Sequence, residues 1–190
     1  MSRKPPLSNT FFLVSVALMA ALGIVLTRVL RVDLGFARFS LGHMASIMAG
    51  LWLGPVGGAL SGGIADVAGS FLQGYAPNPL ITASAVMWGV IPALTKGLIR
   101  GSRARKAAVL SISICVTSVI CTLGLTYAGL VMIGYDARGI LPARLTQFAA
   151  MTPVTCILAC CLYFSPVTPF IADIRQKGRQ YGEEGNNGHT

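Results

Sequence analysis

Residues 41–73 restrict the possible folds of this chain more than any other segment. These 33 residues are almost entirely apolar, and Asp66 is the only acidic residue among them. As one helix they would extend about 50 Å at a rise of 1.5 Å per residue, whereas the hydrocarbon core of a bilayer is about 30 Å thick. Gly54-Pro55 offers a break, because proline lacks a backbone donor and disfavours helix in the preceding residue. The segment therefore predicts a hairpin of two membrane helices.

Four further apolar segments are long enough to cross a bilayer, since a spanning helix needs about 20 mostly apolar residues. They are residues 11–27, 79–99, 107–134 and 145–164. With the hairpin they predict an all-α membrane protein with six transmembrane helices. We expect one integral membrane domain over residues 1–175 and a polar, glycine-rich, disordered cytoplasmic tail at residues 176–190.

The basic residues predict the orientation of these helices. With six spans, ten of the 15 basic residues fall on one side, which the positive-inside rule places in the cytoplasm together with both termini. A single span in place of the hairpin would export the richest basic loop. The ten residues are Arg3, Lys4, Lys96, Arg100, Arg103, Arg105, Lys106, Arg175, Lys177 and Arg179.

Composition supports the membrane class and excludes others. The chain is 54% hydrophobic and only 11% charged, which is outside the usual range of soluble proteins. Its formal charge of +9 does not indicate nucleic-acid binding, because the basic residues lie between long apolar runs. The five cysteines lie in apolar segments without a CxxC pair, and there are two histidines, so we predict no metal site.

Small residues recur at every fourth position of the hairpin, at Gly50, Gly54, Gly58 and Gly62, and Asp66 follows at the same spacing. This spacing lets helix backbones approach closely, so we predict tight packing of the second helix on the third. Asp66 leaves two interpretations open: a structural partner for serine, threonine or arginine, or part of a ligand site. We interpret His43 as a helix-end histidine held by hydrogen bonds.

The sequence contains no recognisable catalytic constellation. Residues 58–62 read GALSG, one residue longer than the GxSG motif of rhomboid proteases, and no later helix supplies a histidine base. A Walker A motif is absent, so the chain does not hydrolyse ATP by that route. We therefore expect a non-catalytic protein without a cofactor.

Seven short blocks share a family resemblance: RFSLGH at 38–43, AGLWLGP at 49–55, GAL at 58–60, GGIAD at 62–66, TASA at 82–85, WGVIP at 88–92 and LPARL at 141–145. They resemble the substrate-binding S components of energy-coupling factor (ECF) vitamin transporters, and most closely the folate-type branch. The resemblance implies a multi-pass protein of the bacterial cell membrane that binds a vitamin from outside. Its implied partners are a transmembrane coupling protein and two cytoplasmic ATPases, which hydrolyse the ATP.

The resemblance also implies roles for individual residues. The first helix would dock onto the coupling protein through an Ala-x-x-x-Ala surface, here Ala17 and Ala21. Folate presents a flat pterin, a benzoate and two carboxylates, which require a stacking ring, hydrogen-bonding groups and arginine forks. The matching positions for substrate binding are Arg38, Thr82, Ser84, Trp88, Thr122, Arg144 and Gln147.

The identity of the ligand stays open at this stage. Residues 121–124 read CTLG where folate-type members tend to carry Asn-Thr-Leu-Trp. One alternative is therefore an S component for another vitamin or precursor, such as a queuosine precursor or pantothenate. A membrane-embedded enzyme or scaffold without transport is the other.

Overall fold

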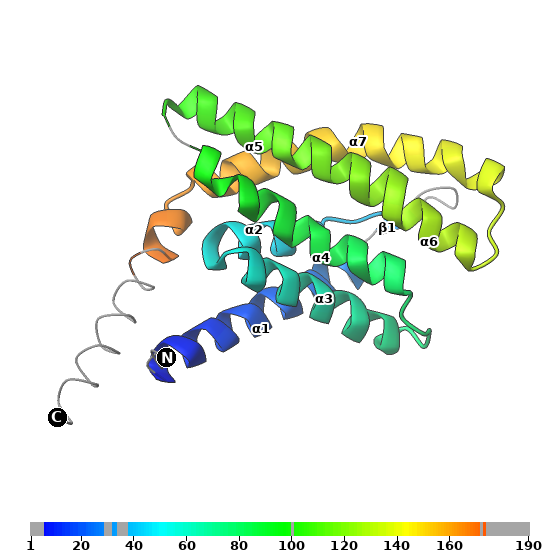
Figure 1. The fold of residues 1–190 in the computed structure, drawn as a ribbon, viewed down its shortest axis with the longest axis horizontal. Helices are drawn as coiled ribbons and strands as arrows, with labels where there is room; N and C mark the ends of the chain where they lie inside the picture. The colour runs from blue at the N-terminus through cyan, green and yellow to red at the C-terminus, as the bar shows by residue number, and fades with distance from the viewer. Residues whose placement is uncertain (1–5, 29–31, 34–37, 100, 172, 174–190) are drawn as a thin grey trace.

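The computed structural model describes residues 6–28, 32–33, 38–99, 101–171 and 173, and this part of the chain is almost entirely helical (Figure 1). The predicted tail at residues 176–190 lies outside the described residues. Two strands of two residues each pair antiparallel, with Val32 opposite Phe39. The elements in chain order are α1 (Pro6–Arg28), β1 (Val32–Asp33), β2 (Arg38–Phe39), α2 (His43–Leu53), α3 (Pro55–Leu72), α4 (Pro79–Leu94), η1 (Thr95–Leu98), α5 (Arg103–Ser118), η2 (Val119–Thr126), α6 (Tyr127–Met132) and α7 (Ala137–Phe164).

The helices form a bundle in which α4 contacts two groups of neighbours. On one side it packs against α2 and α3, which also contact α1, and on the other it packs against α5 and η2. In Figure 1 the start of α1, the α2–α3 turn, the η1–α5 connection and the end of α7 lie at one end of the bundle. The α3–α4 and α6–α7 connections lie at the opposite end, which we call the outer end.

The predicted break in residues 41–73 is confirmed. Gly54 has φ 96°, a conformation that side-chain-bearing residues rarely adopt, and its N–H donates to the carbonyl of Gly50 at 2.9 Å. Pro55 then begins α3 at the first helical position, where a backbone N–H is not needed. Two short-range features therefore turn one apolar stretch into two antiparallel helices.

Helix length and hydropathy identify four candidate membrane spans among the described residues: Thr10–Arg28, Pro79–Leu98, Arg103–Met132 and Ala137–Phe164. The shorter apolar helix α2 has 11 residues, and α3 has 18 residues. The last span begins eight residues earlier than the predicted 145, because the Asp136 carboxylate caps α7 by accepting from Arg138 and Gly139 N–H. Residues 137–144 are thus helical, with Pro142 inside the helix.

The glycines bring three helices into close contact, whereas the sequence predicted close packing of the second and third helices alone. A Cβ added at Gly58 would lie 2.6 Å from the carbonyl oxygen of Gly89 and 2.8 Å from the Cα of Gly50. One added at Gly62 would clash with the carbonyl of Ala85. The small residues therefore bring α2 and α3 into backbone contact with α4 as well as with each other.

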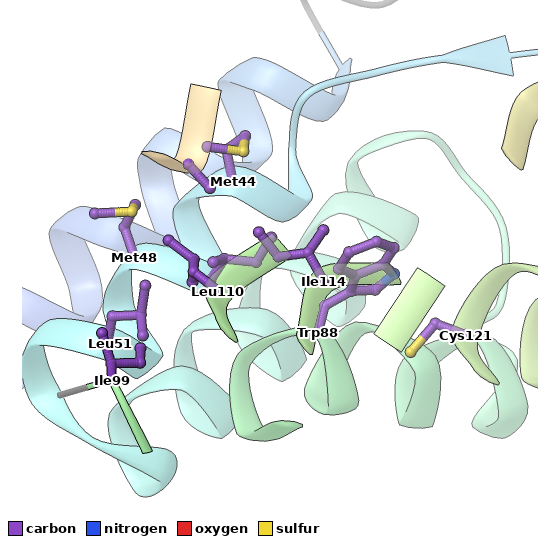
Figure 2. Close-up of a cluster of buried hydrophobic side chains, with 10 residues drawn as sticks. Met44, Met48, Leu51, Trp88, Ile99, Leu110, Ile114 and Cys121 are labelled. Atoms are coloured by element: carbon purple, nitrogen blue, oxygen red, sulfur yellow. The ribbon is translucent and has the colours of Figure 1, made fainter. Parts of the chain in front are cut away.

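A buried apolar cluster joins the two groups of helices. Its fully buried members include Ile47 and Leu51 of α2 and Leu110 and Ile114 of α5. Figure 2 shows Trp88 of α4 beside Ile114 in the same cluster. The indole of Trp88 is only 4% exposed. The middle of α4 is therefore packed between its neighbours.

Candidate substrate-binding site

The outer end of the bundle brings together residues that are distant in sequence. Strand β2 contacts α7, and β2 is separated from the start of α2 by only three residues. This connection places the segment that contains Arg38 next to the helix that contains Arg144. The structure describes the backbone of Arg38 within β2, so its role as a ligand contact stays a prediction.

His43 and Trp88 form an aromatic stack where α2 begins. Their ring centroids are 4.7 Å apart and the ring planes differ by 9°. His43 is the first residue of α2 and is half-buried, whereas Trp88 is buried. His43 lies at a helix end as predicted, but the described residues form no hydrogen bond with it, and it contacts Trp88 through its ring face. One face of the predicted stacking residue is thus covered by a side chain that we had not placed in the site.

Ser84 connects α4 to the π-helical segment η2. Its hydroxyl accepts from Thr126 Oγ1 at 3.0 Å and donates to the carbonyl of Cys121 at 3.3 Å. Cys121 and Thr126 are five residues apart, which in an α-helix would separate them by about 140° around the axis. The i to i+5 geometry of a π-helix places both on the same face, towards Ser84. Ser84 is buried, and its two hydrogen bonds link α4 to η2.

Three other predicted residues lie on η2 and α7. Thr122 is half-buried in η2, next to Cys121. Arg144 and Gln147 are both half-buried on α7, and Arg144 Nη1 donates to Gln147 Oε1 at 2.6 Å. A guanidinium held by an amide oxygen keeps its planar fork oriented, which favours recognition of a carboxylate.

Thr82 lies on a different side of α4 from Ser84 and Trp88. Its hydroxyl donates to Asp66 Oδ2 of α3 at 2.7 Å, whereas Ser84 faces η2. The open question about Asp66 is thereby answered in part, because this carboxylate has a threonine partner across the α3–α4 interface. Of the predicted residues on α4, the structure brings Ser84 and Trp88 together and separates Thr82 from them.

The Asp66–Thr82 bond leads to a stability prediction. Interhelical hydrogen bonds in membrane proteins contribute about 0.6 kcal/mol on average and about 1.7 kcal/mol at most. Thr82→Val should therefore reduce the free energy of unfolding by about 0.6–1.7 kcal/mol. Asp66→Asn keeps an acceptor oxygen, so it should reduce the free energy of unfolding less. Unfolding of the purified protein in mixed micelles measures both. A larger loss for Asp66→Asn than for Thr82→Val would contradict this account of the pair.

Arg28 is an outer-end residue whose environment the sequence did not predict. It ends α1 and donates from Nη1 to Gln73 Oε1 at 2.5 Å, and the hydroxyl of Tyr75 bonds to the same oxygen. A Cβ at Gly69 would lie 2.7 Å from Arg28 Nε, so the guanidinium packs directly on the α3 backbone. A cation at the carboxyl ends of two helices is electrostatically favourable. The sequence feature that could have indicated this environment is the position of Arg28 in the last turn of an apolar helix.

The predicted docking residues are not on the side of α1 that contacts the core. Ala17 and Ala21 are exposed, together with Leu18 on the same surface, whereas Val16 and Ala20 are 3% exposed. The described residues contain no group of three or more histidine, cysteine, aspartate or glutamate side chains that could hold a metal ion.

The fold and the outer-end residues define a small helical membrane protein with polar and aromatic side chains gathered between its helices. The chain belongs to the family of ECF transporter substrate-specific components, whose family model matches residues 11–170. Members of this family are substrate-binding subunits of transporters and are generally non-catalytic.

A solved structure has a similar fold: the crystal structure of FolT bound with folic acid. The TM-score is 0.59 at 19% sequence identity, and the similarity covers 77% of this chain and 89% of that one. No curated protein sequence matches this chain significantly.

Proposed function

We propose that this chain is the substrate-capture subunit of an ECF-type vitamin importer and that folate is its substrate. Membership of the S-component family supports the capture role. The observation that carries the choice of site is the His43–Trp88 stack. Three residues separate His43 from β2, β2 contacts α7, and α7 carries the Arg144–Gln147 pair. An aromatic group and an oriented guanidinium suit a flat, carboxylated ligand.

The proposed topology has six transmembrane helices with both termini in the cytoplasm of a bacterial cell. The topology is supported by six helical segments of alternating direction, namely α1, α2, α3, α4 with η1, α5 with η2 and α6, and α7. Lys96, Arg103 and Arg105 belong to η1 and the start of α5, at the end of the bundle opposite the outer end. Residues 1–175 would then form the membrane domain and residues 176–190 a cytoplasmic tail.

ATP hydrolysis in this proposal belongs to two cytoplasmic ATPases that act through a transmembrane coupling protein. The exposed Ala17 and Ala21 surface of α1 would contact that protein, because small residues at a spacing of four permit close helix approach. Substrate contacts are assigned to Arg38, Thr82, Ser84, Trp88, Thr122, Arg144 and Gln147.

A second candidate is an S component for another vitamin or precursor. The observation that favours it is the Cys121 position, which faces Ser84 and offers neither an amide nor an indole to a pterin. Queuine and pantothenate are the alternatives to test first.

A ligand panel tests the proposed function. Folic acid at about 100 times its Kd is expected to stabilise the detergent-purified protein by about 2.7 kcal/mol. This corresponds to a rise of about 5–10 °C in the thermal midpoint for a chain of this size. The thermal midpoint is measured with folic acid, queuine and pantothenate separately. Stabilisation by queuine or pantothenate alone would favour the second candidate, and no response to any of the three would contradict both.

A further inference from the structure

We propose that His43 contacts the substrate through its ring nitrogens, while Trp88 holds the imidazole in position. The inference rests on the proposed function, since it assumes that the substrate binds at the site proposed there. It adds a binding residue to that site and narrows the ligand to one with a flat, polar-edged ring.

The stack fixes the imidazole rigidly. Trp88 is buried, and its helix is linked to η2 by Ser84, one turn before it. Because the two ring planes differ by only 9°, the imidazole lies flat on the indole. Its two nitrogens therefore point outward from the edge of the stack in a defined plane.

Those nitrogens are available to a ligand. A neutral imidazole offers one N–H donor and one acceptor nitrogen. Among the described residues, none forms a hydrogen bond with His43, whose recorded contact is the stack on Trp88. The side chain is half-buried, whereas the next residue, Met44, is 5% exposed. Polar atoms that are shielded from water usually have a hydrogen-bond partner. For the nitrogens of His43, the substrate would supply this partner.

The position of His43 suggests which part of a ligand it binds. Three residues separate it from β2, and β2 contacts α7, the helix of Arg144 and Gln147. Arginine forks suit carboxylates, whereas a paired donor and acceptor suits the N–H and C=O edge of a heteroaromatic ring. Folate and queuine have such an edge, and pantothenate has no ring.

The decisive variant is His43→Phe, which keeps an aromatic ring on Trp88 and removes both nitrogens. We expect a thermal midpoint close to wild type and an affinity for folic acid, or for queuine if that is the ligand, at least tenfold weaker by isothermal titration. His43→Ala should bind no better than His43→Phe. Trp88→Phe, with His43 intact, should lose less affinity than His43→Phe.

A His43→Phe protein that binds within twofold of wild type would overturn the inference and leave the proposed function intact. Wild-type protein that binds only pantothenate would also overturn the inference, and it would favour the second candidate function over folate. Wild type that binds none of the three ligands would contradict the proposed function and this inference with it. Should His43→Phe fail to fold, His43→Gln decides the question. It keeps polar atoms, so it should bind at least threefold more tightly than His43→Ala, and equal affinities would contradict the role of the nitrogens.

Discussion

Replacing Gly89 with valine is expected to prevent assembly of the helix bundle. A Cβ at this position would lie 2.7 Å from the Cα of Gly58 and closer still to the Gly58 carbonyl group. The obstacle is backbone, which cannot rotate away as a flexible side chain can. Overpacking of a core typically costs about 1–3 kcal/mol, and the added γ-methyl groups place this variant at or above the upper end. Because α4 also carries Ser84 and Trp88, ligand binding should be lost with the fold.

Yield of monodisperse protein after size-exclusion chromatography and the thermal midpoint measure this effect. Gly89→Ala should show a smaller fall in the midpoint, because it adds the Cβ alone. Gly97→Ala is the matched control: a Cβ at Gly97 meets no atom within 4 Å, so its midpoint should equal that of wild type. A Gly89→Val protein with wild-type yield and midpoint would mean that α3 and α4 are not in backbone contact.

Arg144→Ala is expected to abolish high-affinity binding of a carboxylated ligand. Removing one partner of a buried, hydrogen-bonded charge pair costs about 2–5 kcal/mol in binding, which corresponds to a loss of about 30-fold to several thousand-fold in affinity. The guanidinium is half-buried and bonded to Gln147, so its removal should affect the ligand more than the fold. Isothermal titration with folic acid gives the affinity, and the thermal midpoint without ligand reports the fold.

Arg138→Ala is the control for this experiment. Arg138 belongs to the first turn of the same helix and is exposed, so the variant removes an equal charge from the same end of the molecule. Its affinity for folic acid should stay within about threefold of wild type, because exposed charges contribute little at physiological salt. Equal losses for the two variants would indicate a general electrostatic effect and remove Arg144 from the proposed site.

The features of the fold that were predicted correctly have short-range causes. The hairpin turn depends on two adjacent residues, Gly54 and Pro55, whose backbone preferences hold in any surroundings. The start of α7 was predicted wrongly. The continuous apolar run begins at residue 145, whereas the Asp136 cap starts the helix at Ala137. Arg144 consequently belongs to a helix, although the sequence placed it just before one.

The arrangement of the site depends on long-range packing, which the residue pattern does not specify. Thr82 and Ser84 are two residues apart and chemically similar, yet one faces Asp66 of α3 and the other faces η2. The partner of Trp88 is His43, which is 45 positions away in the sequence. Nothing in residues 119–126 distinguishes a π-helix from an α-helix by apolar pattern alone.

The π-helical segment η2 also restricts insertions and deletions within residues 119–126. Asn78 donates to the carbonyl of Gly129 at 3.0 Å, three residues after η2 ends, so this contact depends on the direction in which η2 delivers α6. Deleting one residue from 119–126 would turn every later residue of the helix by about 100° relative to α4, which would carry the Gly129 carbonyl away from Asn78. The connection at 133–136 has local requirements, a φ of 99° at Gly134 and the Asp136 cap of α7, but it has no register to keep against α4. Across related sequences, insertions and deletions should therefore be tolerated in that connection and excluded from the eight residues of η2.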